Sequence, residues 1–402
     1  MAASRTNGGG GSGAAVNGQS VQTQRRVGFY AVLALVACLA GCASRPETGF
    51  LEPVAVSAPG AVSHEILVAT TRERDPRPGT LFNGERASAL DYAQLTVSVP
   101  PTHVASNIEW ASSAPGDPAT NFVVRQESYL DGDKEFLRDL NAQLAARPPG
   151  KRRVLVFIHG YNTMFAEGLY RFAQVVHDSK AVAVPVLFTW ASRGRLTDYV
   201  YDNNSATAAR DNLEHTLRLI LASDAEQVNV IAHSMGNWVA VEALRQIKIS
   251  GRIPSPEKFG HIILASPDID VDVFKSQMRR FGKPKKPFII VLSRDDKALA
   301  LSKFIAGGQN RLGATDDLDE LTALGAIVID LSDLKGMDST NHDKFAQLAE
   351  VAPDLIPVLE QGVGANLDSN SQGQQASAGA LGSVVALPLT ILGAPIRIIS
   401  GR

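Results

Sequence analysis

From residue 151 onward, short apolar runs alternate with longer amphipathic stretches. The apolar runs are continuous and rich in Val and Ile, which is typical of strands buried on both faces of a parallel sheet. Repeated strand–helix units of this kind predict an α/β fold, with a doubly wound, mostly parallel sheet and helices on both faces. Strands are expected at residues 154–158, 184–189, 228–232, 261–265, 288–292 and 327–331. Helices are expected at residues 165–178, 205–222, 237–248, 271–279 and 299–305.

The segment before residue 150 has shorter β-rich runs, at residues 65–70, 93–99 and 121–126, separated by Pro, Gly, Asn and Asp. Residues 133–146 form an amphipathic pattern with an apolar stripe, which predicts a helix. We interpret these elements as the start of the same fold. The predicted domain therefore spans residues 64–362, with a β-rich part at 64–150 and a catalytic core at 151–362.

The first 42 residues have the pattern of a targeting signal. Residues 1–24 are rich in Gly, Ser, Asn and Gln, and are interpreted as a disordered extension or an over-long start of the reading frame. Arg25 and Arg26 precede an apolar run at 27–39, which is too short to span a bilayer comfortably. The run ends in Leu-Ala-Gly-Cys, which resembles the bacterial lipobox and predicts lipidation of Cys42. The alternative is an ordinary signal, or a short anchor with an incidental cysteine.

Lipidation would attach the protein to the bacterial cell envelope. Ala43 follows the cysteine, which by resemblance to proteobacterial lipoproteins indicates the outer membrane, facing the periplasm. Residues 43–63 are then expected to be a tether.

The C-terminal region is less informative. Residues 363–380 are rich in Gln, Ser and Gly and are interpreted as a linker. Residues 381–402 are largely apolar but contain Pro388 and Pro395, which disfavour a straight transmembrane helix. The segment could lie on the membrane or pack back on the domain, and the sequence leaves this open.

Composition narrows the functional classes. Hydrophobic residues make up 45% of the 402 residues and charged residues 20%, as in a globular protein. Lys and Arg total 39 against 41 Asp and Glu, so no basic field exists to attract nucleic acid. The two cysteines, Cys38 and Cys42, both precede the domain, which excludes a disulfide or a cysteine metal site within it.

The strongest motif is Ala232-His233-Ser234-Met235-Gly236, which joins a predicted buried strand to a predicted helix. This is the context of a nucleophile elbow, in which the serine occupies a sharp turn and its flanking positions must be small. Ala232 and Gly236 meet that need, and Ser234 is the predicted nucleophile. The alternative is that Ser234 is an ordinary helix N-cap.

A nucleophilic serine needs a base and an acid that follow it in the order Ser, Asp or Glu, His. Only His261 and His342 follow Ser234, and His261 opens a strand at the sheet edge opposite the site, so His342 is the predicted base. Asp296, after the strand at 288–292, is the favoured acid. Asp295 is its alternative, and Asp268 is a weaker candidate.

The oxyanion requires two N–H donors. The first candidate is the backbone N–H of Met235, directly after the nucleophile. The second is the backbone N–H of Tyr161, because Gly160 allows the chain to turn after the strand at 154–158. His159 precedes Ser234 in the chain, so we assign it a structural role.

Together these segments resemble a bacterial family of α/β-hydrolases long classed as a domain of unknown function and described as esterase/lipase-superfamily enzymes. The resemblance covers residues 64–345, and implies the α/β-hydrolase fold and a triad of Ser234, Asp296 and His342. In that family the terminal histidine often follows a glycine, whereas Asn341 precedes His342 here. The matching stretches are 69–72, 84–86, 97–100, 156–162, 185–194, 231–237, 264–270 and 292–302.

The leading functional hypothesis is a serine hydrolase that cleaves carboxylic esters of small molecules or lipids through an acyl-enzyme. It requires no metal or organic cofactor, and the sequence leaves the oligomeric state open. Two alternatives remain: transfer of amide or lipid acyl groups by the same triad, and a non-catalytic envelope lipoprotein that binds lipid or protein.

Overall fold

The computed structural model describes residues 45, 48–251, 253–282, 286–350, 385–391 and 394–400. The predicted signal peptide with Cys42 and the predicted linker at 363–380 lie outside this range. All elements below belong to the unit Glu47–Arg402. None of the helices within the described range is long and apolar enough to cross a membrane.

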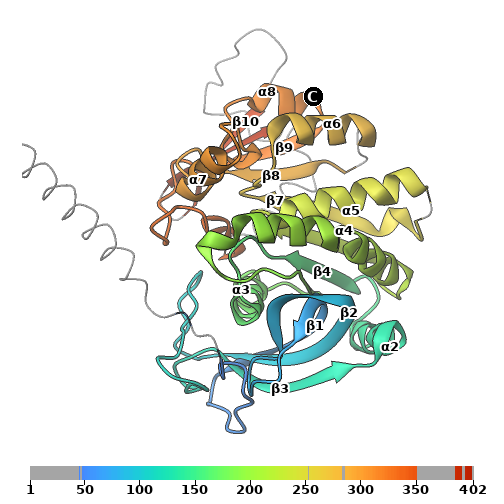
Figure 1. Cartoon of the computed structure of the whole chain (residues 1–402), viewed down its shortest axis with the longest axis vertical. Helices are drawn as coiled ribbons and strands as arrows, with labels where there is room; N and C mark the ends of the chain where they lie inside the picture. Colours follow the sequence, from blue (N-terminus) through green and yellow to red (C-terminus); the bar gives the residue numbers. More distant parts are fainter. Residues whose placement is uncertain are drawn as a thin grey trace, which may run out of the picture. The chain divides into compact units, whose positions relative to one another are not determined.

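A single sheet runs through the whole domain (Figure 1), and its described strands follow the order β10-β11-β9-β8-β7-β6-β4-β5-β1-β2-β3. The strands from β9 to β1 in that order are all parallel to their neighbours. Antiparallel strands extend the sheet at both edges. The parallel strands are β1 (Val62–Arg74), β4 (Arg153–Ile158), β5 (Val184–Thr189), β6 (Gln227–His233), β7 (Phe259–Ala265), β8 (Phe288–Leu292) and β9 (Ala326–Asp330). The antiparallel strands are β2 (Phe82–Val99), β3 (Val123–Leu130), β10 (Val385–Ile391) and β11 (Ala394–Ser400).

Helices cover both faces of the sheet, because the parallel strands direct successive apolar side chains to opposite sides. In β4, Val154 and Val156 enter one apolar cluster, and Leu155 and Phe157 enter the other. The first cluster packs against α2 (Gly132–Ala145), α4 (Tyr199–Ala222), α5 (Gly236–Ser250), α6 (Val271–Phe281) and α8 (Leu318–Ala323). The second packs against α3 (Phe165–Asp178). Helix α7 (Lys297–Ile305) follows β8.

This arrangement confirms the predicted doubly wound, mostly parallel sheet with helices on both faces. The continuous Val and Ile runs located the central strands within about two residues. Helix α4 begins at Tyr199, earlier than the predicted residue 205, because the polar run Asp202-Asn203-Asn204 interrupts the apolar pattern after its first residues. The short helix α8 was not predicted.

The predicted tether at 43–63 differs from the structure where it is described. Leu51 is buried, and its N–H donates to the carbonyl of Gly79 at 3.0 Å. The carbonyl of Phe50 accepts a hydrogen bond from the Tyr170 hydroxyl at 2.7 Å. These contacts attach residues 50 and 51 to the domain, and β1 starts at Val62. The domain therefore begins earlier than the predicted residue 64.

The apolar C-terminal segment packs back on the domain as a β-hairpin. Strand β11 pairs antiparallel with β9, with Ile398 opposite Ile329, and β10 pairs antiparallel with β11. The side chain of Ile398 is fully buried. Pro388 lies in β10, at the outer edge of the sheet, where a missing N–H is tolerated. The sequence left open whether this segment lies on the membrane or packs back on the domain, and its described residues pack back on the domain.

Replacing Ile398 with Ala should lower the free energy of unfolding by about 2–5 kcal/mol, because it leaves a cavity against β9. The matched control is Arg397→Ala in the same strand. Arg397 is exposed and pairs at 3.1 Å with the exposed Asp333, so its loss should cost less than about 1 kcal/mol. Urea unfolding of the full chain measures both. Equal stability of the two variants would contradict the pairing of β11 with β9.

Candidate active site

Ser234 occupies the turn between β6 and α5 and has a left-handed backbone conformation, with φ of 53°. The turn is tight because α5 passes directly against the end of β4. A Cβ at Gly236 would lie 2.3 Å from the carbonyl oxygen of His159 and 2.7 Å from that of Ile158. Only glycine fits there, so the motif has the geometry expected of a nucleophile elbow.

Hydrogen bonds from neighbouring segments hold the Ser234 backbone in place. Its N–H donates to the carbonyl of Ala265, at the end of β7, at 3.0 Å. Its carbonyl accepts from the side-chain amide of Asn237 at 2.8 Å and from the N–H of Asp268 at 3.2 Å. These bonds offset the strain of a positive φ, and they tie the serine to the strand beside it.

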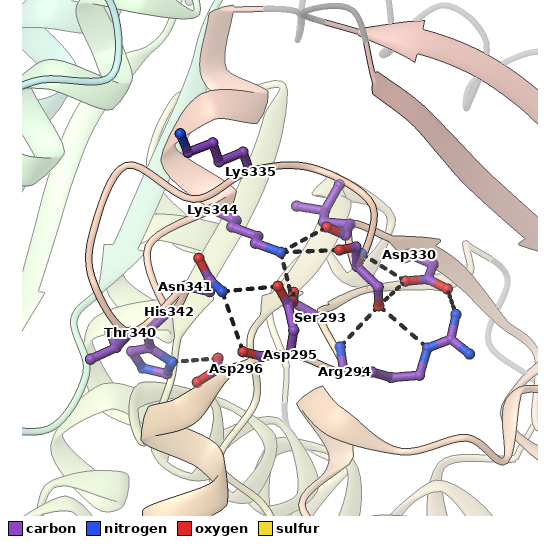
Figure 2. Close-up of polar contacts among 12 residues, drawn as sticks. Ser293, Arg294, Asp295, Asp296, Asp330, Lys335, Thr340, Asn341, His342 and Lys344 are labelled. Carbon is purple, nitrogen blue, oxygen red and sulfur yellow. Dashed lines mark hydrogen bonds and ion pairs between the residues drawn. The ribbon is translucent and has the colours of Figure 1, made fainter.

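The imidazole of His342 contacts the carboxylate of Asp296. The Nδ1 and Oδ2 atoms are 2.6 Å apart, and the side chain of Asp296 is completely buried (Figure 2). Asp296 follows β8 and also caps α7, since its Oδ1 accepts from the N–H of Leu299 at 2.9 Å. Helix α7 therefore holds one oxygen of the carboxylate, while the other oxygen contacts the imidazole.

Asp295 points away from His342 and binds other groups of the same loop (Figure 2). Its carboxylate accepts from Nζ of Lys344 at 2.6 Å and from the side-chain amide of Asn341 at 2.9 Å. The side chain of Lys344 is completely buried, and its Nζ also donates to the carbonyl of Leu331 at 3.1 Å. Of the two adjacent carboxylates, Asp296 contacts the histidine and Asp295 anchors the loop that carries it.

The loop before His342 is fixed by Asp338 and Asn341. The carboxylate of Asp338 accepts from the N–H groups of Thr340 at 2.9 Å and of His342 at 3.1 Å. Asn341 has a positive φ of 59°, a conformation that suits glycine and that asparagine tolerates better than most residues. This explains why Asn341 can stand where similar sequences often have glycine.

The surroundings of His342 favour its protonated form. Burial lowers the pKa of His342, but the hydrogen bond and charge of Asp296 outweigh burial and raise it overall. The ring of His233 lies 4.7 Å from that of His342. Burial, and then repulsion from His342, lower the pKa of His233 to about 3. Of the two neighbouring rings, His342 is the one that can accept a proton near neutral pH.

The loop after β4 passes directly over Ser234. A Cβ at Gly160 would lie 2.6 Å from the Cβ of Ser234. Asn162 has a positive φ of 57°, and its N–H donates to Oδ2 of the buried Asp202 at 3.0 Å. Asp202 thereby fixes the peptide that follows Tyr161. Met235 directly precedes α5, at an end where N–H groups have no partner inside the helix.

Arg72 also binds the loop after β4. No role was assigned to it from the sequence. Its side chain is buried, and Nη2 donates to the carbonyl of Thr163 at 2.7 Å. Nη1 donates to the carbonyl of Ser192 at 2.8 Å, and Nε to the hydroxyl of Thr189 at 2.8 Å. Arg72 and Asp202 come from distant parts of the chain. The sequence gives little signal for either role: Arg72 ends the stretch 69–72 that resembles the family, and Asp202 lies in the first turn of α4.

The other sequence candidates take different places. His159 is buried, with Nε2 2.8 Å from the hydroxyl of Thr189, and burial and the charge of Arg72 lower its pKa well below the usual value. His261 lies near the start of β7, at the opposite edge of the sheet from Ser234. Asp268 directs its carboxylate to Ser302 and Arg311. None of the three contacts Asp296.

Comparisons with known proteins identify a family and two solved structures that are similar to the chain. The family described as "Alpha/beta hydrolase of unknown function (DUF900)" matches residues 133–358. An esterase of Pyrococcus furiosus shares 10% identity with a TM-score of 0.24, covering 68% of this chain and 84% of its own. The siderophore hydrolase EstB of Aspergillus nidulans shares 13% identity with a TM-score of 0.25, covering 78% and 87%. No curated protein sequence matches the chain significantly.

The contact with Asp296 predicts that His342 titrates above the usual histidine pKa of about 6.5. In Asp296→Asn the anion is removed while an N-cap side chain remains, so the pKa of His342 should fall below that of the wild type. NMR titration of the histidine ring protons measures this. Asp295→Asn is the control and should change the pKa less, because Asp295 makes no contact with the ring. A larger shift in the Asp295 variant would contradict the assignment.

Proposed function

Because the chain belongs to the family of α/β hydrolases of unknown function, we propose that it is a serine hydrolase that cleaves carboxylic esters through an acyl-enzyme. Ser234 is the nucleophile, His342 the base and Asp296 the acid that orients the base. The observation that carries the proposal is the contact between His342 and the buried Asp296, beside the elbow that holds Ser234.

The proposed reaction has two steps. His342 takes the proton of the Ser234 hydroxyl while Oγ attacks the ester carbonyl carbon, and the imidazolium then gives that proton to the leaving alcohol oxygen. A water molecule next attacks the acyl-enzyme, with His342 again as the base, and releases the carboxylic acid and free Ser234. Asp296 stabilises the imidazolium in both steps, which agrees with the raised pKa of His342.

The tetrahedral intermediates need donors for their oxyanion. In this proposal the backbone N–H groups of Met235 and Tyr161 supply them. The N–H of Asn162 is already bound by Asp202, which favours Tyr161 as the donor from the loop after β4. Arg72 and Asp202 act as positioning residues, because they bind that loop at the adjacent residues Thr163 and Asn162.

We further propose that the protein is anchored to the bacterial cell envelope by lipid at Cys42, and that it hydrolyses esters of small molecules or lipids there. Residues 25–42 alone support the anchor. The mass of the mature N-terminus tests it, since a lipidated cysteine at residue 42 is expected and its absence would refute the anchor.

Treatment of the full chain with a fluorophosphonate probe tests the catalytic proposal, with peptide mapping to locate the label. The probe should label Ser234, and Ser234→Ala should abolish labelling. His342→Ala should slow it by about a thousandfold or more, because the base is lost. His261→Ala is the matched control and should label at nearly the wild-type rate, since His261 lies at the opposite edge of the sheet.

A folded wild-type protein that takes up no label would overturn the proposal and favour a binding lipoprotein. Cleavage of amides or transfer of acyl groups to lipids at rates above ester hydrolysis would keep the triad and change the substrate.

A further inference from the structure

Arg311 is a nine-tenths buried cation that has a single ionic contact among the described residues. Its Nε lies 3.2 Å from Oδ1 of Asp268, in a geometry that makes no hydrogen bond. The Asp268 carboxylate is also bound by the hydroxyls of Ser302 at 2.5 Å and Tyr199 at 3.2 Å. Across the described part of the chain, no acceptor is hydrogen-bonded to Nη1 or Nη2 of Arg311. The carboxylate is thus satisfied, whereas the guanidinium is not.

The Nε–H of Arg311 is unfavourably placed, because it has lost water without gaining a hydrogen bond. Such a group is stabilised when a ligand supplies the missing acceptors. The planar fork of an arginine matches the two oxygens of a carboxylate or phosphate, and binds them by parallel hydrogen bonds.

The backbone of Arg311 is rigidly held between two loops of the site. Leu312 donates its N–H to the carbonyl of Ile269 at 2.9 Å, in the segment after β7. The carbonyl of Gly313 accepts from the N–H of Ser293 at 2.9 Å, directly after β8. A Cβ at Gly313 would lie 2.7 Å from the backbone nitrogen of Pro267, so the two segments are in close contact. Arg311 is therefore positioned by the same loops that position Asp296.

The cluster around Arg311 is continuous with the surroundings of Ser234. The N–H of Asp268 donates to the Ser234 carbonyl at 3.2 Å. The ring of Tyr199, which binds Asp268, lies 5.1 Å from the ring of Tyr161 in the loop over the nucleophile. Asp268 and Tyr199 therefore connect the Arg311 cluster to the residues around Ser234.

The geometry points to Arg311 as a specificity-determining residue that binds an anionic group of the ester substrate, a carboxylate or a phosphate. This inference rests on the proposed function and narrows its substrates to esters that carry a negative charge near the scissile bond. The carboxylate of Asp268 holds the guanidinium of Arg311 in place and partly neutralises its positive charge.

Steady-state kinetics of the full chain on two pairs of aryl esters test this. One pair is 4-carboxyphenyl acetate and its neutral methyl ester, which place the charge on the alcohol side. The other is monophenyl adipate and its neutral methyl ester, which place the charge on the acyl side. The wild type should prefer the anionic member of at least one pair by about tenfold or more in kcat/KM. Arg311→Gln should remove that preference and leave the rate on the neutral ester within about threefold.

Two further variants test whether Arg311 recognises the anionic ester or only forms a structural ion pair with Asp268. Asp268→Asn removes the opposing charge and should increase the preference for the anionic ester, whereas loss of a structural pair would lower the rates on both members alike. Arg218→Gln is the matched control, because Arg218 pairs with Glu214 along α4 and should leave the preference unchanged. Circular dichroism of each variant checks that it is folded.

Hydrolysis by the wild type without a preference for either anionic ester would overturn the inference and leave the proposed function standing. Equal losses on charged and neutral esters in Arg311→Gln would also overturn it. If none of the four esters is hydrolysed, the proposed function fails and the inference fails with it.

Discussion

The close approach of α5 to the end of β4 is the constraint on which the site depends. Gly236 is the point of contact, and the tight turn before it holds Ser234, two residues earlier, in a left-handed conformation. A positive φ at a non-glycine residue costs on the order of 1–3 kcal/mol, so the turn persists only because its neighbours hold it. Three other residues with positive φ, Asn162, Ser266 and Asn341, lie in the surrounding loops. The residues with a strained backbone at this edge of the sheet therefore lie around Ser234.

Buried charges hold these strained loops together. Arg72 binds the loop after β4 through the carbonyl of Thr163, and Asp202 binds it through the N–H of Asn162. Lys344 joins the histidine loop to Asp295. Burying a charge is costly unless it is paired or hydrogen-bonded, and removing one partner strands the other. We therefore attribute the position of His342 relative to Asp296 to these buried, paired charges, because they leave the loops few other stable conformations.

The sequence predicted the central sheet well, because strands buried on both faces need uninterrupted apolar runs, and β5 and β8 have the predicted bounds. It also predicted the turn at Ser234, since flanking small residues are a local requirement. The sequence favoured Asp296 as the acid but left Asp295 as its alternative, because adjacent residues differ only in the direction of their side chains. Arg72, Asp202 and the pairing of β11 with β9 were missed, since each depends on contacts between segments far apart in the chain.

The most direct test of the account is the pH dependence of fluorophosphonate labelling at Ser234, measured as a rate in the wild type and in Asp296→Asn. If the neutral imidazole of His342 acts as the proposed base, the rate should rise with pH through a pKa above about 6.5, as the raised pKa of His342 requires. In Asp296→Asn the rate should fall and its midpoint should move to lower pH, because the anion that stabilises the imidazolium is gone. A rate that is flat from about pH 5 to about pH 8, or a midpoint unchanged in the variant, would contradict the coupling of Ser234, His342 and Asp296.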